Sequence, residues 1–321
     1  MYHYVRDLHR SRYPRIKGLT IEKFEGQLDY IIKHYKVCSL KQIMSIILNG
    51  DSLPPRSILL TFDDGFADHY LNVFPLLDER GLAGSFFPPA KAIMEHRVLD
   101  THKIHFILAS TEDHRKLIED IFRLIKPYRG QYKIPEDKDL YKMFATEGRY
   151  DAPQVVFIKK VLQKGLPNGL RLDVIDRLFA EYVNVDEESF AKELYLDVNQ
   201  LSCMVRHGME VGGHGYTHRS FEGLAISEQI NEVDRTIELL KSIYGYAPSN
   251  WAMSYPYGTY DKTTLELLKK TGCMLGLTTS VGLVADLSRP LELNRLNTND
   301  LPFRGDENPC EWTRKIQQAS F

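Results

Sequence analysis

The chain has 321 residues, 43% of them apolar and 26% charged, which is enough for one large α/β domain or two smaller ones. The formal net charge at pH 7 is -2, from 41 basic and 43 acidic side chains mixed along the chain. This balance excludes a strong electrostatic attraction to nucleic acid or to an anionic membrane. We therefore expect no nucleic-acid partner.

Cysteines and termini narrow the class of protein further. Cys38, Cys203, Cys273 and Cys310 are scattered and lack the CxxC spacing of a thiolate metal site or a redox pair, so we expect buried free thiols. No stretch approaches the roughly 20 apolar residues that span a bilayer. Residues 1–6 lack the apolar region of a signal peptide. The sequence thus predicts a cytoplasmic protein, although a chain that had lost its leader would show the same pattern.

The elements before the first motif alternate in type. Hydrophobic periodicity predicts helices over 20–35 and 39–49, with an extended piece at 35–38 between them. The apolar run 57–62 has no alternation, which is typical of a strand covered on both faces. It leads directly into two aspartates, Asp63 and Asp64.

The next elements complete a β-α-β unit and then change in character. A helical stripe runs from Tyr70 to Leu77, and a strand over 84–87 ends at two prolines. Residues from about 95 to 195 are more charged and mostly helical in pattern, so we predict an inserted helical subdomain.

Alternating β and α patterns return after the insertion. We predict strands over 208–213 and 274–279, a strand that ends at 255–258, and helices around 230–240 and 265–268. Repeated β/α units favour a parallel sheet or barrel.

Asp63 and Asp64 stand at the end of a predicted buried strand. Neighbouring carboxylates repel, and both stay ionised beside an apolar strand only if a cation or hydrogen-bond donors offset the charge. Asp-Asp-Gly alone is common in surface turns. Parallel α/β folds, however, place their active sites at the C-terminal ends of strands. We therefore interpret the pair as part of a divalent-metal site.

Two histidines, His214 and His218, supply further candidate ligands. Their i and i+4 spacing lets both imidazoles reach one metal from a single turn or tight loop. Two histidines and one carboxylate form an open ligand set that leaves a position for water. The alternative is that the two side chains cap or pack a loop.

Three segments, taken in order, resemble the polysaccharide deacetylases, the NodB-like carbohydrate esterases of family 4 type. They are 61–65 (Thr-Phe-Asp-Asp-Gly), 208–218 (Gly-Met-Glu-Val-Gly-Gly-His-Gly-Tyr-Thr-His) and 255–258 (Tyr-Pro-Tyr-Gly). Segments 2–5 and 84–87 agree with the resemblance more weakly.

The resemblance implies an α/β fold, a distorted (β/α) barrel of about seven units with a helical insertion. Its expected boundaries are 1–95 and 196–300 for the barrel, 96–195 for the insertion and 301–321 for a C-terminal tail. The implied activity is metal-dependent removal of an acetyl or other N-acyl group from an amino sugar or glycan. The partner implied is thus an N-acylated sugar or glycan.

The resemblance also assigns roles residue by residue. Asp64, His214 and His218 would bind the divalent metal, for which we expect zinc, and Asp63 would be the catalytic base. The backbone amide of Tyr257 would contact the oxyanion of the tetrahedral intermediate, with the metal as the stronger partner. The metal would lower the pKa of its bound water and polarise the amide carbonyl.

This chain departs from the family pattern at two places. Relatives carry an arginine before the Pro-Tyr-Gly segment that orients the base, whereas the aligned residue here is Ser254. Asp63 must then be oriented differently. Relatives also carry a late histidine as general acid, but no histidine follows His218, and the stretch 291–295 occupies that place.

Candidates for the acid come from the start of the insertion. His102 and His105 are tentative acids, and their alternative interpretation is as helix-surface or helix-packing histidines. Arg295 and Asp300 are candidates for the rim of the site, while Asp68 and His69 are explained as a solvated helix start.

The function predicted is a metal-dependent carbohydrate N-deacetylase of surface-polysaccharide or glycolipid metabolism. A long insertion near the barrel mouth would restrict the cleft to small or chain-end sugars. The alternatives are a catalytically impaired glycan-binding protein on the same fold and a deformylase of a modified sugar.

Overall fold

The computed structural model describes residues 1–148 and 151–318, and the chain divides into two compact units. The first comprises Met1–Asp7, Gly18–Arg97 and Ala191–Phe321, and the second Leu8–Lys17 and Val98–Phe190. The predicted boundaries differ from this division by a few residues at both ends of the insertion, and in two larger ways. Residues 8–17 join the helical unit, and residues 301–318 are part of the first unit rather than a separate tail.

Parallel strands form the centre of the first unit. The three sheets are β1–β2 (Lys36–Val37, Ser57–Ile58), β3–β4–β5 (Thr61–Asp63, Ser85–Phe87, Glu210–Val211) and β6–β7–β8 (Trp251–Ser254, Cys273–Val281, Leu293–Arg295). Parallel bridges from Tyr2 to Phe62 and from Gly213 to Met253 extend this order. The carboxyl ends of β3 and β6 therefore lie at the same edge. The mixed α/β fold is as predicted, and closure of the strands into a barrel stays a prediction.

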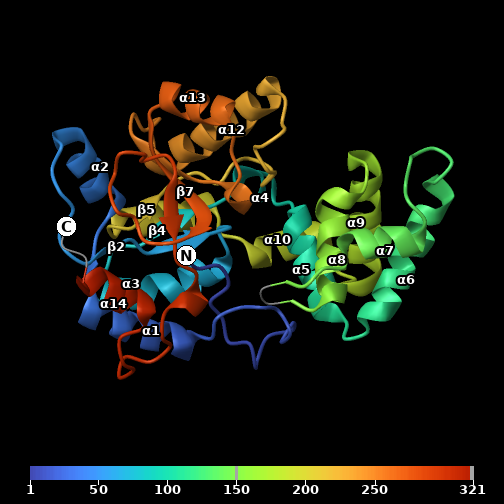
Figure 1. Cartoon of the computed structure of the whole chain (residues 1–321). Helices are drawn as coiled ribbons and strands as arrows, with labels where there is room; N and C mark the ends of the chain where they lie inside the picture. Colours follow the sequence, from blue (N-terminus) through green and yellow to red (C-terminus); the bar gives the residue numbers. More distant parts are fainter. Residues whose placement is uncertain (149–150, 319–321) are drawn as a thin grey trace. The chain divides into compact units, whose positions relative to one another are not determined.

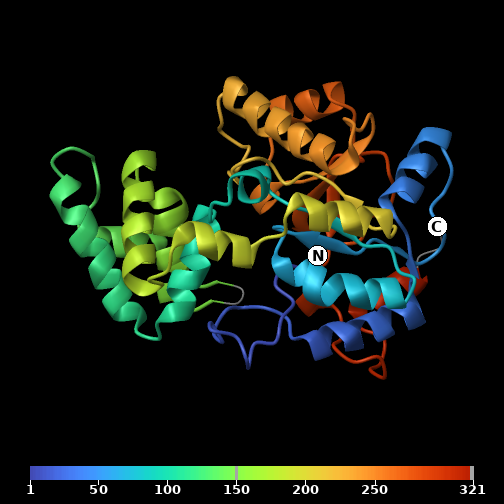
Figure 2. The same cartoon turned by 180° about the vertical axis from the view of Figure 1, so that it is seen from behind.

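Helices cover these strands on opposite sides (Figures 1 and 2). Figure 1 shows α12 and α13 on one side and α1, α3 and α14 on the other. The helices of this unit are α1 (Ile21–His34), α2 (Leu40–Asn49), α3 (Phe74–Glu79), α4 (Ala90–Glu95), α11 (Val198–Arg206), α12 (Ile226–Tyr244), α13 (Lys262–Lys270) and α14 (Glu311–Gln318). In the part of the chain that the structure describes, no helix is long and apolar enough to cross a bilayer.

Local sequence explains where several of these helices begin and end. The Thr20 side chain accepts a hydrogen bond from the Lys23 amide at the start of α1. Ser39 and Gln42 form a capping box at α2, which ends at Gly50 in the left-handed conformation. These signals account for the agreement between the predicted and observed bounds of both helices.

The second unit is helical. It contains α5 (Asp100–Ser110), α6 (His114–Ile125), α7 (Asp137–Phe144), α8 (Pro153–Lys160) and α9 (Asn168–Tyr182), and α10 (Glu187–Leu194) leads back to the first unit. A buried Lys103 lies 2.6 Å from Asp176 and 3.1 Å from Glu187. Burial of this ammonium is thus matched by two carboxylates.

Aromatic rings fill the core beneath the motif strand β3. The Phe62 ring stacks on Tyr2 at 5.1 Å and on Phe86 at 4.8 Å between centroids, and Phe62 and Phe86 are fully buried. These contacts join the N-terminal segment, β3 and β4 into one layer.

The N-terminal segment is held beside β3 by residues that follow the aspartate motif. The Asp68 carboxylate accepts hydrogen bonds from the Val5 amide and the Arg6 guanidinium, and His69 Nε2 donates to the His3 carbonyl at 2.9 Å. Asp68 is 8% exposed and His69 is fully buried. The prediction of a solvated helix start at these two residues is therefore wrong. The helical stripe of the sequence begins at Tyr70, and it did not indicate that Asp68 and His69, at the start of the π-helical turn His69–Val73, are buried.

Stability should depend on pH through His69. Burial lowers the pKa of its imidazole to about 4, so below the ordinary histidine pKa the unfolded chain takes up a proton that the folded chain does not. Stability contributed by this group should be lost as pH falls from about 6.5 toward 4, by about 2 kcal/mol between pH 7 and pH 5. Denaturant unfolding of wild type and His69→Gln at both pH values measures it. Equal pH dependence in the two proteins would contradict the prediction.

Candidate active site

The two aspartates separate at the end of β3. Asp63 is the last residue of the strand and its amide donates to the Tyr2 carbonyl, whereas Asp64 adopts a left-handed backbone with φ 75° and donates to the Phe87 carbonyl. A residue other than glycine in this conformation costs free energy, and such residues are frequent at functional sites. The change of conformation lets the two neighbouring carboxylates face different partners.

Asp64 meets the two motif histidines. Its Oδ1 lies 3.4 Å from His214 Nε2 and 3.3 Å from His218 Nε2, and the candidate ligand atoms all lie within 4.8 Å of one another. All three side chains are buried. The structure thus brings together the three predicted ligands, although Asp64 lies 150 or more positions from the two histidines in the sequence.

The donor set fits a divalent metal. His214 Nδ1 lies 2.7 Å from the Ser254 carbonyl, which can only accept, so this nitrogen carries a proton and Nε2 is the ring atom that faces Asp64 and would bind the ion. Two imidazole nitrogens and a carboxylate oxygen are ligands that zinc and similar divalent ions take. Asp64, His214 and His218 are therefore suited to hold such an ion.

Close packing places the histidine loop next to α12. Gly213 precedes His214, and a Cβ at Gly213 would lie 2.3 Å from Thr236 Cγ2 on that helix. Only glycine lets the backbone come this near. Gly213 thus has a packing role beside the candidate ligand His214.

Asp63 is held by an arginine from β8. Arg295 Nη1 donates to Asp63 Oδ1 at 3.0 Å, Arg295 Nη2 lies 2.9 Å from Oδ2, and the Ser254 hydroxyl donates to Oδ2 at 3.1 Å. Burial by itself would raise the pKa of the Asp63 carboxyl, but Arg295 and the neighbouring His214 hold that pKa well below its usual range. Asp63 is therefore an ionised, oriented carboxylate.

The arginine that contacts Asp63 is Arg295, which the sequence predicts only as a candidate for the rim of the site. Ser254 occupies the position before Pro-Tyr-Gly where relatives carry an arginine, and its hydroxyl donates to Asp63. Arg295, which lies 232 residues beyond Asp63 in the sequence, orients this carboxylate instead. No spacing in the sequence indicates this, because it depends on where β8 ends relative to β3. Asp300, the other rim candidate, accepts a hydrogen bond from the Asn297 amide. The two residues form a capping box at the turn Thr298–Asp300.

A third imidazole lies at the cluster. His3 Nε2 is 4.0 Å from Asp64 Oδ2, and 41% of the His3 side chain is exposed, against 4% for Asp64. Sequence reasoning used the segment 2–5 only as support for the resemblance and gave His3 no role. The hydrogen bond from His69 to the His3 carbonyl fixes the backbone at this position.

Tyr257 lies beside His218. Its backbone is left-handed with φ 57°, and its ring lies edge-on to the His218 ring at 5.0 Å between centroids. The Thr279 hydroxyl donates to the Tyr257 carbonyl at 3.2 Å, and a Cβ at Gly258 would lie 2.2 Å from that hydroxyl oxygen. The turn is thus fixed next to a candidate ligand. Contact of the Tyr257 amide with an oxyanion stays a prediction.

His102 and His105 lie on α5 in the helical unit. The His102 side chain is fully buried, and the two rings are 5.8 Å apart between centroids. The burial of His102 resembles that of a helix-packing residue. The role of either histidine as general acid stays a prediction.

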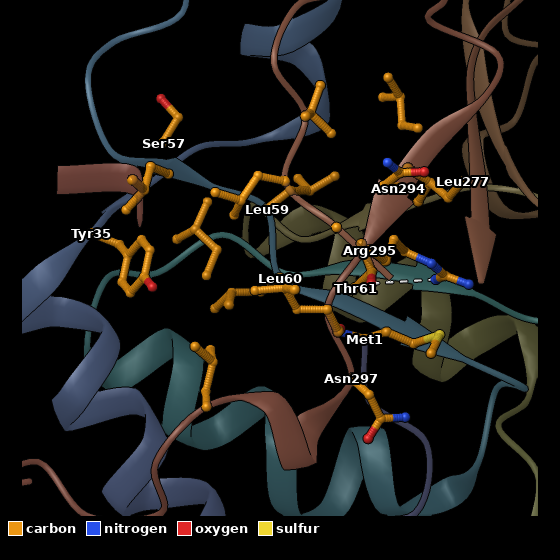
Figure 3. A pocket seen from close by; sticks show the side chains of 18 of the residues that line it. Met1, Tyr35, Ser57, Leu59, Leu60, Thr61, Leu277, Asn294, Arg295 and Asn297 are labelled. Carbon is orange, nitrogen blue, oxygen red and sulfur yellow. Dashed lines mark hydrogen bonds between the residues drawn. The ribbon is translucent and has the colours of Figure 1, made fainter. Parts of the chain in front are cut away.

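A separate cavity of about 180 Å³ lies beside Arg295 (Figure 3). Its lining is mostly aliphatic, with Leu60 and Leu277 among it and Thr61 and Arg295 at a polar edge. Figure 3 marks the 3.4 Å hydrogen bond from Arg295 to the Thr61 hydroxyl. The three candidate ligands are not among the described lining residues, so this cavity is distinct from the metal cluster.

Comparison of sequences identifies relatives of part of the chain. Residues 177–276 match the family model described as polysaccharide deacetylase, a range that includes both histidines and the Pro-Tyr-Gly segment. YxkH of Bacillus subtilis, whose name places it among the polysaccharide deacetylases, is 28% identical over 95 residues. The peptidoglycan deacetylase of Helicobacter pylori is 32% identical over 73 residues. These alignments cover 30% and 23% of this chain, and they span only 33% and 24% of the two relatives.

Comparison of structures covers nearly the whole chain. The deacetylase PplD of Streptococcus pyogenes, solved in complex with acetate, gives a TM-score of 0.54 at 17% identity and covers 92% of this chain and 89% of its own. A de-N-acetylase from Aggregatibacter actinomycetemcomitans gives a TM-score of 0.53 at 12% identity, with 98% and 97% covered. At these identities the likeness shows a shared fold. The sequence matches and the motifs together confirm the predicted resemblance of this chain to the polysaccharide deacetylases, the NodB-like carbohydrate esterases.

Proposed function

We propose that this protein is a metal-dependent hydrolase that removes an acetyl or other N-acyl group from an amino sugar or glycan, in surface-polysaccharide or glycolipid metabolism. One observation carries the proposal. Asp64, His214 and His218 converge on a common point, and the adjacent Asp63 is held ionised by Arg295. A ligand set next to an oriented carboxylate is the arrangement that hydrolysis of an amide by activated water requires.

Each residue has a defined task in this proposal. Asp64, His214 and His218 would hold the divalent ion, which when bound lowers the pKa of its water toward about 7 and polarises the acyl carbonyl. The Asp63 carboxylate would accept the proton of the attacking water through Oδ1, which receives only the contact from Arg295 Nη1 and keeps a second lone pair, whereas Oδ2 contacts both Arg295 and Ser254.

The substrate needs further contacts on its amide side. The Tyr257 amide is the proposed partner of the oxyanion, and His102 and His105 stay the candidates from the sequence for the donor of the proton to the leaving amine. We further propose that His3 contacts the acylated amino sugar, because its imidazole is partly exposed and lies 4.0 Å from a candidate ligand.

Two alternatives make different predictions in one assay. A glycan-binding protein without turnover would bind amino sugars but release no acid under any supplied metal. A deformylase would use the same residues and release formate rather than acetate. The orientation of Asp63 by Arg295 favours an enzyme over the binding protein. Burial of this ion pair carries a desolvation penalty, and sugar binding alone would not need an oriented carboxylate beside the candidate ligands.

Removal of the metal should abolish activity. We expect the purified protein to contain a divalent ion, to lose acetate release on chelation and to regain it with Zn²⁺ or Co²⁺. Asp63→Asn should keep the metal and lower kcat at least about 100-fold, a typical loss for general-base removal, whereas His214→Ala should lose the metal. Metal analysis and acetate release from free, nucleotide-linked and polymeric N-acetylamino sugars measure this. Unchanged activity of Asp63→Asn or of metal-free protein would refute the proposal.

Arg295 should act through Asp63. Arg295→Met leaves a buried carboxylate without its cation, so we expect the pKa of Asp63 to rise, kcat to fall more than KM changes, and stability to drop by about 3 kcal/mol. Arg295→Lys should retain part of the activity because it keeps the charge and loses the two-nitrogen geometry. In the Asp63→Asn background Arg295→Met should add little further loss of activity. Additive losses in the double variant would show that the two residues act independently.

The activities of histidine variants can identify which imidazole contacts the substrate. His3→Gln, His102→Gln and His105→Gln should be assayed side by side with His9→Gln, an exposed histidine, as the control. We expect His3→Gln to lower kcat/KM by about 10-fold or more with unchanged metal content, since a lost contact to a reacting group costs at least that much. Full activity of His3→Gln alongside a loss in either other variant would assign the role to the insertion.

A further inference from the structure

A carboxylate outside the metal cluster holds the loop between the two histidine ligands. Glu232, on α12, is 3% exposed. Its Oε2 accepts hydrogen bonds from the Tyr216 amide at 2.6 Å and the Thr217 amide at 2.9 Å. Its Oε1 accepts a hydrogen bond from the Thr217 hydroxyl. One buried side chain thus binds three donors from the two residues that lie midway between His214 and His218.

The same loop is held from its carbonyl side. The Gly215 and Tyr216 carbonyls accept hydrogen bonds at 2.9 Å from the Ala90 and Lys91 amides, at the first residues of α4. The loop backbone is therefore bonded on both edges, by a helix start through its carbonyls and by Glu232 through its amides. Little freedom remains for the segment that sets the distance between the two imidazoles.

The shape of the loop agrees with a close approach of this carboxylate. Gly215 has φ 71°, and a Cβ at this position would lie 3.0 Å from Glu232 Oε2. The backbone conformation favours glycine, and a side chain here would also make a tight contact with the carboxylate oxygen. The glycine of the His-Gly-Tyr-Thr-His motif thus agrees with the close approach of Glu232, which lies 15 positions beyond Thr217.

The geometry points to a positioning role for Glu232: we propose that it sets the spacing of His214 and His218 before the metal binds. The inference rests on the proposed metal-dependent function. If the loop is already ordered, metal binding does not lose the conformational entropy of ordering it. Loss of partners that orient metal ligands typically costs 10–100-fold in affinity. Glu232 itself is not a ligand, because its oxygens are occupied by the three loop donors.

Metal affinity of matched variants tests the proposal. Glu232→Gln keeps the shape of the side chain but not the charge, and Glu232→Ala removes all three hydrogen bonds. Glu238→Gln is the control, since Glu238 lies on the same helix with 53% of its side chain exposed. Competition with a chelator gives Zn²⁺ affinity, and the visible spectrum of the Co²⁺ form reports the ligand geometry. We expect affinity to fall about 10-fold in Glu232→Gln and about 100-fold in Glu232→Ala, with no change in Glu238→Gln.

A metal-free measurement separates positioning from general destabilisation. In Glu232→Gln, hydrogen exchange should accelerate at the 216 and 217 amides while the protection of α12 and β5 stays as in wild type. Thr217→Val, which removes one donor, should weaken affinity by less than Glu232→Gln. If wild type binds Zn²⁺ and both Glu232 variants bind it within twofold of wild type, the inference is overturned and the proposed function stands. If wild type binds no divalent ion, the proposed function fails, and the positioning role fails with it.

Discussion

Two adjacent carboxylates buried at the end of one short strand are the constraint on which the rest of the site depends. Asp63 and Asp64 are 1% and 3% exposed, and neither can be ionised there without a positive partner. The left-handed conformation of Asp64 directs the two side chains to separate partners. Asp63 meets a guanidinium, and Asp64 meets two imidazoles with which it could hold a cation.

Satisfying that constraint draws on the whole first unit. Arg295 comes from the end of β8, the imidazoles from the loop after β5, and Ser254 from the end of β6, where its carbonyl orients His214 and its hydroxyl contacts Asp63. Parallel strands end at a common edge, so groups distant in sequence meet there. The architecture thus serves to bring opposite charge to two carboxylates.

Supporting contacts behind the site are themselves buried and polar. His69 holds the His3 carbonyl, and Glu232 holds the amides of Tyr216 and Thr217. In both cases a side chain that could be charged or solvated on a surface has been used to fix backbone near the cluster. Such contacts are made by polar residues outside the hydrophobic pattern. The sequence therefore indicates neither the burial of His69 nor the contacts of Glu232.

The sequence alone determined the short-range features: the helices with capping signals such as α1 and α2, the buried strand that ends at Asp63, and the candidate ligands Asp64, His214 and His218. Local propensity and motif spacing act over a few residues, so they can be recognised in the sequence itself. Only the tertiary structure decided that Arg295 replaces the missing arginine, that His3 reaches the cluster and that residues 301–318 join the first unit. These outcomes depend on which strand ends become neighbours, and that follows from packing across hundreds of positions rather than from any local pattern.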